Sequence, residues 1–301
     1  MKKLFLPFLI FILFVTADHA EELNAVRQAN VTVLFDTGLE NAAVSVAGTY
    51  PDVKDGLEKI IGWKVDFSPT VYLVKTHERF LRMSGHPLVI GFAVPERMLI
   101  VLDFSKLVSG SSSLRSIMKH ELCHLLLHKN IKSKNLPRWL DEGVSQWVSG
   151  GTADIVMAEI TRVDSAIVTG RQISFKYLSG SFPGDNDNLV LAYAQSKSIV
   201  EYMVNEYGTK GLLNMLGSLG KGNDIEEAVH ETFLITFDQL EKNWYSAMNK
   251  KITWLNVFIE HLYEVLFFIG ALSLIIAYIK TVIRKRARQY EEDDDQQGHP
   301  L

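Results

Sequence analysis

Two histidines and a glutamate stand at the spacing of a metal site carried by one helix. His120, Glu121 and His124 form an HExxH pattern. Residues four apart on a helix differ by about 400° of rotation, so both histidines point the same way and can bind one cation through neutral imidazoles. Glu121 projects beside them, where it can take a proton from a metal-bound water whose pKa the metal lowers. This spacing predicts metal-assisted hydrolysis, with one Zn²⁺ per chain.

The sequence around the pattern predicts the helix that this chemistry needs. Apolar residues recur at helical spacing from 112 to 129, after a serine-rich N-cap. Arg115, Lys119 and Lys129 lie on the same segment, and such charges argue against a membrane-embedded site. The metal site is therefore expected outside the bilayer.

A tetrahedral catalytic zinc takes three protein ligands and keeps its fourth position for water. Seventeen residues separate His124 from Glu142, which follows a proline suited to opening a short helix, and Glu142 is the predicted third ligand. Asp141 is the adjacent alternative, although its direction on a helix differs by about 100°. His128 is a second alternative one turn further along, but each step of four residues drifts by about 40°.

Composition narrows the kinds of partner and site. The 301 residues are 47% hydrophobic, which predicts a folded core rather than a disordered chain. A net charge of −4 gives no basic field, so no nucleic acid partner is expected. The single cysteine, Cys123, excludes an internal disulfide and a zinc site built of cysteines.

An apolar segment lies near each end of the chain. Lysines precede the first, and small residues follow it, which predicts a signal peptide at 1–20; an uncleaved anchor is the alternative. The second predicts a transmembrane helix at 258–280, and the basic cluster after it predicts a cytoplasmic tail at 281–301. A buried core helix is the alternative there. We therefore expect a single-pass membrane protein whose catalytic part is extracytoplasmic, in the periplasm or outside the cell.

The part between these segments has an α+β pattern. Apolar and β-branched runs predict strands at 31–35, 71–74 and 98–102, with a helix between the first two that breaks or restarts at Pro51. This gives an α+β lobe at 21–110 and a mainly helical lobe at 111–253. The helices predicted after residue 111 lie at 112–129, 138–148, 153–168, 190–207, 209–219, 223–232 and 237–250.

Three segments between residues 90 and 250 resemble a known family. The HExxH pattern is followed by WLxEG at 139–143 and AYxQS at 192–196. Together they resemble the gluzincin clan of zinc metallopeptidases, and more closely the bacterial peptidase MA-like family. The resemblance implies a thermolysin-like catalytic domain, zinc held by His120, His124 and Glu142, and Glu121 as general base. It also makes Tyr193 a candidate for stabilising the tetrahedral oxyanion, whereas on an amphipathic helix a tyrosine is commonly a core residue.

These features predict a membrane-anchored zinc metallopeptidase that hydrolyses peptides or proteins. The glutamate-containing segment by which related aminopeptidases grip a free amino terminus is missing before the strand at 98–102. Two alternatives stay open. One is a non-catalytic binding module, against which the retained Glu121 argues; the other is a zinc hydrolase of another amide, such as one in cell-wall material.

Overall fold

The computed structural model describes residues 23–28, 30–87, 89–109, 114–150, 159–260 and 262–297. The chain divides into two compact units, one ending at Trp244 and the other beginning at Tyr245. The predicted signal peptide at 1–20 lies outside the described residues, as do the first residues of the helices predicted at 112–129 and 153–168.

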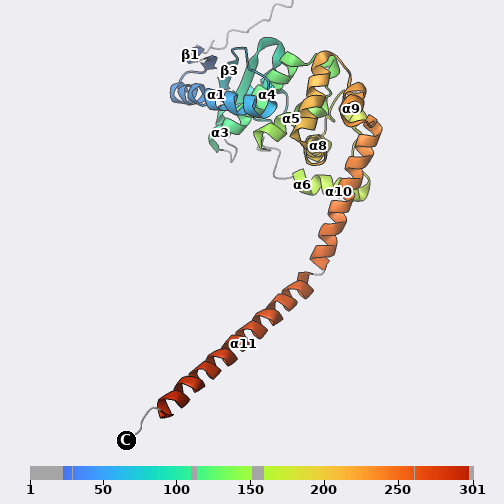
Figure 1. The fold of residues 1–301 in the computed structure, drawn as a ribbon. Coiled ribbons are helices and arrows are strands. Elements are labelled where there is room, and N and C mark those ends of the chain that lie inside the picture. The colour runs from blue at the N-terminus through green and yellow to red at the C-terminus, as the bar shows by residue number, and fades with distance from the viewer. Residues whose placement is uncertain are drawn as a thin grey trace, which may run out of the picture. The chain divides into compact units, whose positions relative to one another are not determined.

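A five-stranded mixed sheet forms the first half of the larger unit (Figure 1). Its strands are β1 (Asn24–Gln28), β2 (Val31–Phe35), β3 (Thr70–Val74), β4 (Gly91–Val94) and β5 (Leu99–Asp103), in the spatial order β1-β2-β3-β5-β4. The pairs β2–β3 and β3–β5 are parallel, whereas β1 and β4 pair antiparallel with β2 and β5. β4 is therefore an edge strand.

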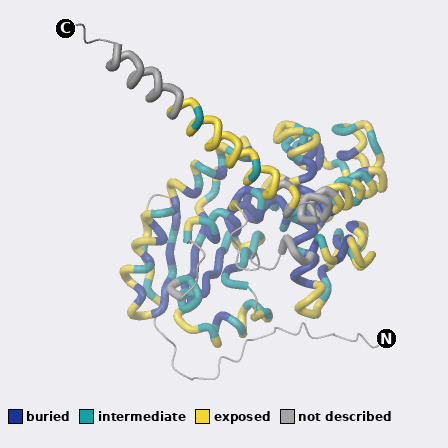
Figure 2. Tube along the Cα trace, turned by 90° about the horizontal axis from the view of Figure 1, so that it is seen from below, coloured by how far each residue is buried: buried dark blue, intermediate teal, exposed yellow. Residues whose placement is uncertain are grey.

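Helices cover the sheet and bury its central strands. They are α1 (Glu40–Ile61), α2 (His77–Ser84), α3 (Phe104–Ser109) and α4 (Leu114–Asn130), with a 3-10 turn at Pro95–Arg97. α1 and α4 pack side by side against the sheet (Figure 1). Phe80 of α2 packs with Tyr72 and Val101 in an apolar cluster. Strands covered in this way are buried along most of their length (Figure 2), which is why β3 and β5 are apolar except for Thr70 and Asp103 at their ends.

The second half of this unit is helical. It contains a 3-10 turn at Ser133–Asn135, α5 (Arg138–Ser149), α6 (Glu159–Thr169), α7 (Phe175–Leu178), α8 (Asn186–Lys221), α9 (Ile225–Phe233) and the beginning of α10 (Phe237–Glu260). α8 packs against α5, α6 and α9. An aromatic cluster ties α5 to the chain that follows: the Trp139 ring lies 5.3 Å from Phe175 and 5.8 Å from Phe237. This anchoring fixes the helix that carries Glu142.

The predicted α+β class is confirmed, but the sequence pattern missed two strands. β1 has the sequence NAVRQ and is largely exposed, so it lacks the apolar run by which a strand is recognised. β4 has only four residues and begins with glycine. Met98 was predicted inside a strand and instead lies before it, in the left-handed region with a φ of 48°. The break predicted at Pro51 is wrong, because α1 continues through this residue.

α8 contains an internal kink at the place where two helices were predicted to meet. Gly208 has a φ of 73° and a ψ of 163°, values outside the helical region. Glycine adopts a positive φ without the penalty of a Cβ atom. The predicted helices at 190–207 and 209–219 therefore correspond to the two parts of α8.

The smaller unit contains the rest of α10 and the helix α11 (Leu262–Gln297). Within α11, residues Leu266–Arg284 form a stretch long and apolar enough to cross a membrane, as judged by length and composition. Large apolar side chains on this stretch, among them Phe267 and Leu274, are exposed. The span was predicted at 258–280; residues 258–260 belong to α10, and α11 continues past residue 280.

Candidate metal centre

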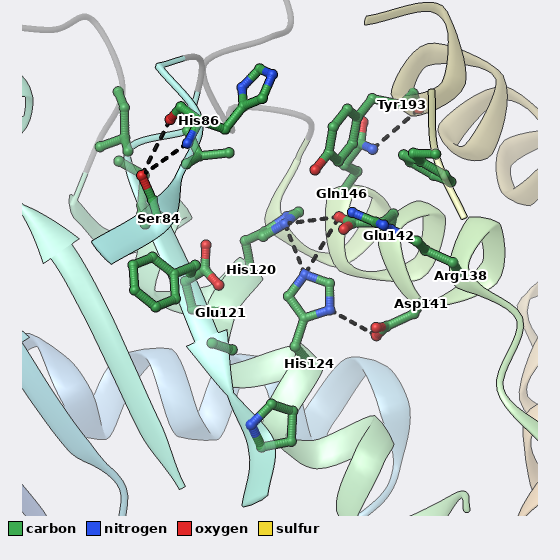
Figure 3. A pocket seen from close by; sticks show the side chains of 18 of the residues that line it. Ser84, His86, His120, Glu121, His124, Arg138, Asp141, Glu142, Gln146 and Tyr193 are labelled. Carbon is green, nitrogen blue, oxygen red and sulfur yellow. Dashed lines mark hydrogen bonds and ion pairs between the residues drawn. The ribbon is translucent and has the colours of Figure 1, made fainter. Parts of the chain in front are cut away.

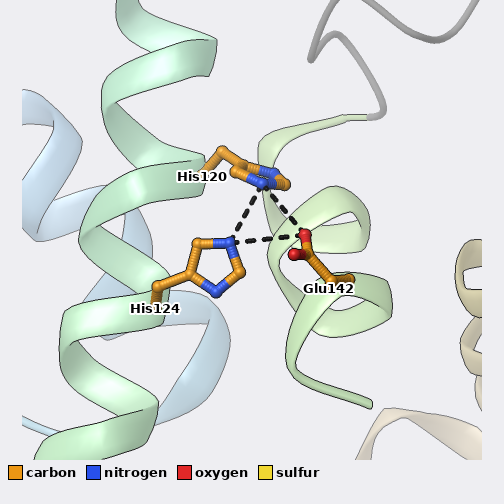
Figure 4. Close-up of side chains that lie close together, drawn as sticks. All are labelled: His120, His124 and Glu142. Carbon is orange, nitrogen blue, oxygen red and sulfur yellow. Dashed lines mark hydrogen bonds and ion pairs between the residues drawn. The ribbon is translucent and has the colours of Figure 1, made fainter. Parts of the chain in front are cut away.

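Three side chains from two helices converge on one point (Figure 4). His120 and His124 project from α4 one turn apart, and Glu142 approaches them from α5. The Nε2 atoms of the two histidines lie 3.1 Å apart. The Oε2 atom of Glu142 lies 3.7 Å from Nε2 of His120 and 3.6 Å from Nε2 of His124. The structure thus brings together the three residues predicted as metal ligands.

The triangle formed by these atoms has the size that a tetrahedral zinc site needs. Zinc binds imidazole nitrogen and carboxylate oxygen at about 2.0–2.2 Å, so neighbouring ligand atoms of a tetrahedron lie about 3.3–3.6 Å apart. The observed separations of 3.1, 3.6 and 3.7 Å lie around that range. Two histidines and one glutamate are also a ligand set of known catalytic zinc sites, with the fourth position left open. The residues present therefore fit zinc.

Asp141 contacts one metal-site histidine, His124, from behind rather than joining the triangle. Its Oδ1 lies 2.7 Å from Nδ1 of His124, and its Oδ2 lies 3.0 Å from Nε2 of His128. A carboxylate can only accept hydrogen bonds, so Nδ1 of His124 carries a proton and Nε2 is the nitrogen left to bind a metal. Burial alone would raise the pKa of Asp141, but His124 and His128 outweigh burial and lower it. Both alternatives for the third ligand, Asp141 and His128, are thus placed outside the triangle.

Glu121 lies beside His120, on the side away from Glu142, and lines the same cavity as the three metal-site residues (Figure 3). Its side chain is buried, with 5% of the residue exposed. Burial raises the pKa of this carboxyl, while the neighbouring His120 and His124 work in the opposite direction. Gly91 of β4 lies directly against it, since a Cβ atom at Gly91 would stand 3.1 Å from Oε1 of Glu121. The edge strand therefore passes close to the one acid in the HExxH pattern.

A cavity of about 420 Å³ opens in front of these residues. In Figure 3, Ser84 and His86 lie on one side of it and Arg138, Gln146 and Tyr193 on the other, with the HExxH residues between. Residues 91–93 of β4 also line the cavity. The cavity thus places an edge strand, a potential proton acceptor and a metal-ligand triangle around one space.

The comparisons with known proteins agree with this geometry. A sequence model of the Peptidase MA superfamily matches residues 91–250. The chain belongs to this superfamily. The match confirms the resemblance found in the HExxH and WLxEG motifs, and it spans β4 as well as the helical half. No curated protein sequence matches the chain.

Two solved structures are similar to the chain. One is yeast LTA4 hydrolase in complex with Bestatin, with 14% identity and a TM-score of 0.45; the match covers 71% of this chain and 36% of that one. The other is an M1 zinc metallopeptidase from Deinococcus radiodurans, with 13% identity and a TM-score of 0.43; the match covers 74% of this chain and 50% of that one. The chain therefore spans half the length of these proteins or less.

Two superfamily motifs meet where α5 packs against α8. Gly143, the last residue of WLxEG, faces the backbone of Ser196, the last residue of AYxQS, and a Cβ atom at Gly143 would stand 2.2 Å from that carbonyl oxygen. Gln146 donates from Nε2 to the Tyr193 carbonyl over 3.2 Å. Gln195 pairs with both backbone groups of Ile173, at 2.9 Å each. The Gly143 and Gln146 contacts fix the distance between the helix of Glu142 and the helix of Tyr193, and Gln195 ties the latter helix to the segment before α7.

Tyr193 lines the cavity, as its predicted role requires, and is also part of an aromatic contact. Its ring meets Phe182 edge-on, with the ring centroids 5.1 Å apart. Burial, followed by the charge of Glu142, raises the pKa of its phenol, which therefore keeps its proton. The two interpretations of this residue, pocket hydroxyl and packed aromatic, are compatible in the structure.

Sequence reasoning missed three residues that shape the pocket. Arg138 and Phe182 line it together, and Gly91 lies against Glu121. The position of Arg138, four residues before Glu142, was a usable signal, because residues at this spacing share one helix face. Phe182 and Gly91 reach the pocket only through the tertiary fold.

Proposed function

We propose that the protein is a zinc-dependent metallopeptidase that cuts peptide bonds in exported peptides or proteins. The observation that carries this proposal is the triangle of His120, His124 and Glu142, together with Glu121 in the same pocket. These three residues would hold the zinc ion. Zinc, when bound, polarises the carbonyl of the bond to be cut and lowers the pKa of a water molecule beside it.

Glu121 is the general base in this proposal. Its carboxylate takes a proton from the attacking water and passes it on to the departing amine, so the same residue acts first as general base and then as general acid. Its burial supports the role, because a carboxylate that is poorly solvated accepts a proton more readily. Asp141 acts indirectly, by keeping the imidazole of His124 in the tautomer that can bind a metal.

Tyr193 supplies the hydrogen bond that the reaction needs at the carbonyl oxygen. Negative charge develops on that oxygen in the tetrahedral transition state, and a positioned donor there stabilises it. The phenol of Tyr193 faces the same cavity as Glu142 and stays protonated at neutral pH. The packing of α5 on α8 through Gly143 holds the phenol in place.

β4 provides a way to bind an extended peptide. It pairs with β5 along one side only, and its residues 91–93 line the cavity. An extended chain can add to such an edge through main-chain hydrogen bonds, whatever its side chains are. This arrangement favours a peptide over other amides as the substrate.

The apolar segments near the two ends suggest where the enzyme works. We propose that the signal at 1–20 directs the catalytic part across the membrane and that the stretch Leu266–Arg284 anchors it. The basic residues that follow this stretch favour a cytoplasmic C-terminus. A C-terminal epitope tag should therefore resist added protease in intact cells and become sensitive after the membrane is opened. A tag that is cleaved in intact cells contradicts this orientation.

Cleavage of a mixed peptide library tests the activity. The full chain is purified in detergent, loaded with zinc and compared by mass spectrometry with Glu121→Gln. We expect cleavage by the native chain and nearly none by the variant, with equal zinc content, because the ligands remain while the base is lost. The new termini also tell whether the enzyme trims ends or cuts internally. Zinc binding without any cleavage would instead support a binding module or a different amide substrate.

A further inference from the structure

The pocket contains a cationic side chain that the proposed hydrolysis does not use. Arg138 is the first residue of α5, and its side chain extends into the pocket near Tyr193 (Figure 3). Its guanidinium carbon lies over the ring of Phe182, 4.7 Å from the ring centre. Phe182 is itself held edge-on against Tyr193. This stack keeps the guanidinium on the wall of the cavity.

Arg138 has no carboxylate partner among the residues that the structure describes. Two other arginines do: Arg79 pairs with Asp36 and Arg115 with Asp52, each at 2.9 Å. A guanidinium carries five N–H donors, and the interaction of Arg138 with the neighbouring Tyr193 does not use them all. Arg138 therefore presents a positive charge and hydrogen-bond donors to whatever enters the cavity.

The other charged residues of the pocket determine where a negatively charged group of a substrate would bind. Glu96, Glu121, Asp141 and Glu142 all line the cavity. Asp141 is paired with two histidines and Glu142 faces the metal position, but Glu96 is exposed in the turn after β4 and has no such role. A negatively charged group on a bound peptide is repelled by Glu96 and attracted to Arg138. The planar fork of a guanidinium also matches a carboxylate in shape, with two parallel hydrogen bonds.

We propose that Arg138 binds a carboxylate of the substrate and makes the enzyme selective for peptides that carry one close to the bond that is cut. This inference rests on the proposed peptidase function. Four residues of helix place Arg138 and Glu142 about 6 Å apart along the axis, and one residue of an extended peptide spans about 3.3 Å. The carboxylate thus belongs to a residue within about two positions of the scissile bond. It is either an Asp or Glu side chain or the C-terminal carboxylate of a short peptide.

Peptide binding to the zinc-loaded Glu121→Gln variant of the full chain tests the proposal without requiring turnover. Matched fluorescent peptides carry Glu or Gln at a single position, and each has a free or an amidated C-terminus. We expect the preferred carboxylate peptide to bind about ten times more tightly than its uncharged partner, or better, because a hydrogen bond to a charged group is lost in the partner. Whether the side-chain pair or the terminal pair shows this difference identifies the source of the carboxylate.

The same comparison in Arg138→Gln and Arg138→Lys isolates the contribution of the guanidinium. We expect the ratio to fall to about one in Arg138→Gln and to an intermediate value in Arg138→Lys, which keeps the charge but not the fork. Arg115→Ala, which removes an exposed arginine from α4, is the matched control and should leave the ratio unchanged. Direct binding of the carboxylate to zinc persists in all these variants and cannot mimic the result.

Two outcomes overturn the proposal: equal binding of every matched pair by the chain with Arg138, or a ratio that is the same with and without it. The peptidase function is judged separately, from cleavage by the native chain. Cleavage with a ratio independent of Arg138 refutes the carboxylate site and keeps the peptidase. A ratio that depends on Arg138, without cleavage of any peptide, refutes the peptidase and keeps the site.

Discussion

Replacing Asp141 by asparagine tests the metal centre without touching a predicted ligand. Oδ1 of Asp141 accepts from Nδ1 of His124 at 2.7 Å, and Oδ2 lies 3.0 Å from Nε2 of His128. Asparagine has nearly the same shape, but it carries no charge and replaces one oxygen by a donor. Asp141→Asn therefore keeps the packing of α5 while removing the charged acceptor behind His124.

The expected size of the effect follows from two independent considerations. Mutation of the residue that accepts a hydrogen bond from a metal-binding histidine typically costs 10- to 100-fold in metal affinity, or about 1.4–2.7 kcal/mol. A single hydrogen bond to a charged group contributes about 1.5–3 kcal/mol, which agrees with this range. We therefore expect the zinc Kd of Asp141→Asn to rise about 10- to 100-fold. The rise in Glu142→Gln should be larger, because that change weakens a ligand itself.

Competition with a chromophoric zinc chelator at fixed pH measures these constants on the full chain. Asp52→Asn is the matched control, since Asp52 makes an exposed ion pair with Arg115 and lies outside the cavity lining. An unchanged Kd in Asp141→Asn refutes the role assigned to this residue. A loss as large as that in Glu142→Gln also refutes it, because it makes Asp141 a ligand.

Three further changes test the packing around the site and an ion pair at the end of α1. Gly143→Ala would bring a methyl group to 2.2 Å from the Ser196 carbonyl oxygen, so we expect it to lower the free energy of unfolding by about 1–3 kcal/mol and to reduce activity. Gly48→Ala is the control, since no atom lies within 4 Å of the added methyl group, and it should be neutral or stabilising. Equal melting temperatures for the two variants contradict this prediction. Gly91→Ala would place a methyl group 3.1 Å from Oε1 of Glu121, and we expect kcat to fall while the zinc Kd stays unchanged; an unaltered kcat shows that β4 does not constrain the base. Hydrogen bonds from Lys64 and the Val65 amide lower the pKa of Glu58 from 4.5 to about 2, so its stabilising effect is complete above pH 4.5 and is lost as the pH falls toward 2. The difference in melting temperature between the native chain and Glu58→Gln should therefore shrink over that range, and a difference independent of pH refutes the assignment.

The part of the site that could be predicted from sequence depends on local geometry. His120 and His124 face the same way because any helix places residues four apart on one face, and α4 is a helix. Glu142 was chosen over Asp141 by spacing and direction, and α5 does turn the two carboxylates to different sides of His124. Tyr193 came from resemblance alone. Its position in the cavity depends on contacts between α5 and α8 that no local pattern encodes.

The part that could not be predicted depends on tertiary contacts between distant segments. β4 contributes to the sheet through pairing with β5, although its four residues carry no strand pattern of their own. Phe182 reaches Arg138 and Tyr193 only because the chain between α7 and α8 folds over the pocket. The second contact of Asp141, to His128, joins residues on two helices. In each case the contacting residues are far apart in the sequence, and the packing of helices and strands brings them together.

α5 connects these observations, because neighbouring residues on it serve different parts of the pocket. Glu142 faces the two histidines, Asp141 supports one of them from behind, and Gly143 allows α8 to approach. Arg138 projects from the same helix toward the substrate side of the cavity, and Trp139 fixes the helix in the aromatic cluster. Five of the six residues 138–143 therefore have a specific contact in or beside the pocket, so few substitutions in this segment would preserve the site. Trp139, Glu142 and Gly143 are fixed positions of the WLxEG motif, whereas the contacts that complete the pocket are spread along the chain.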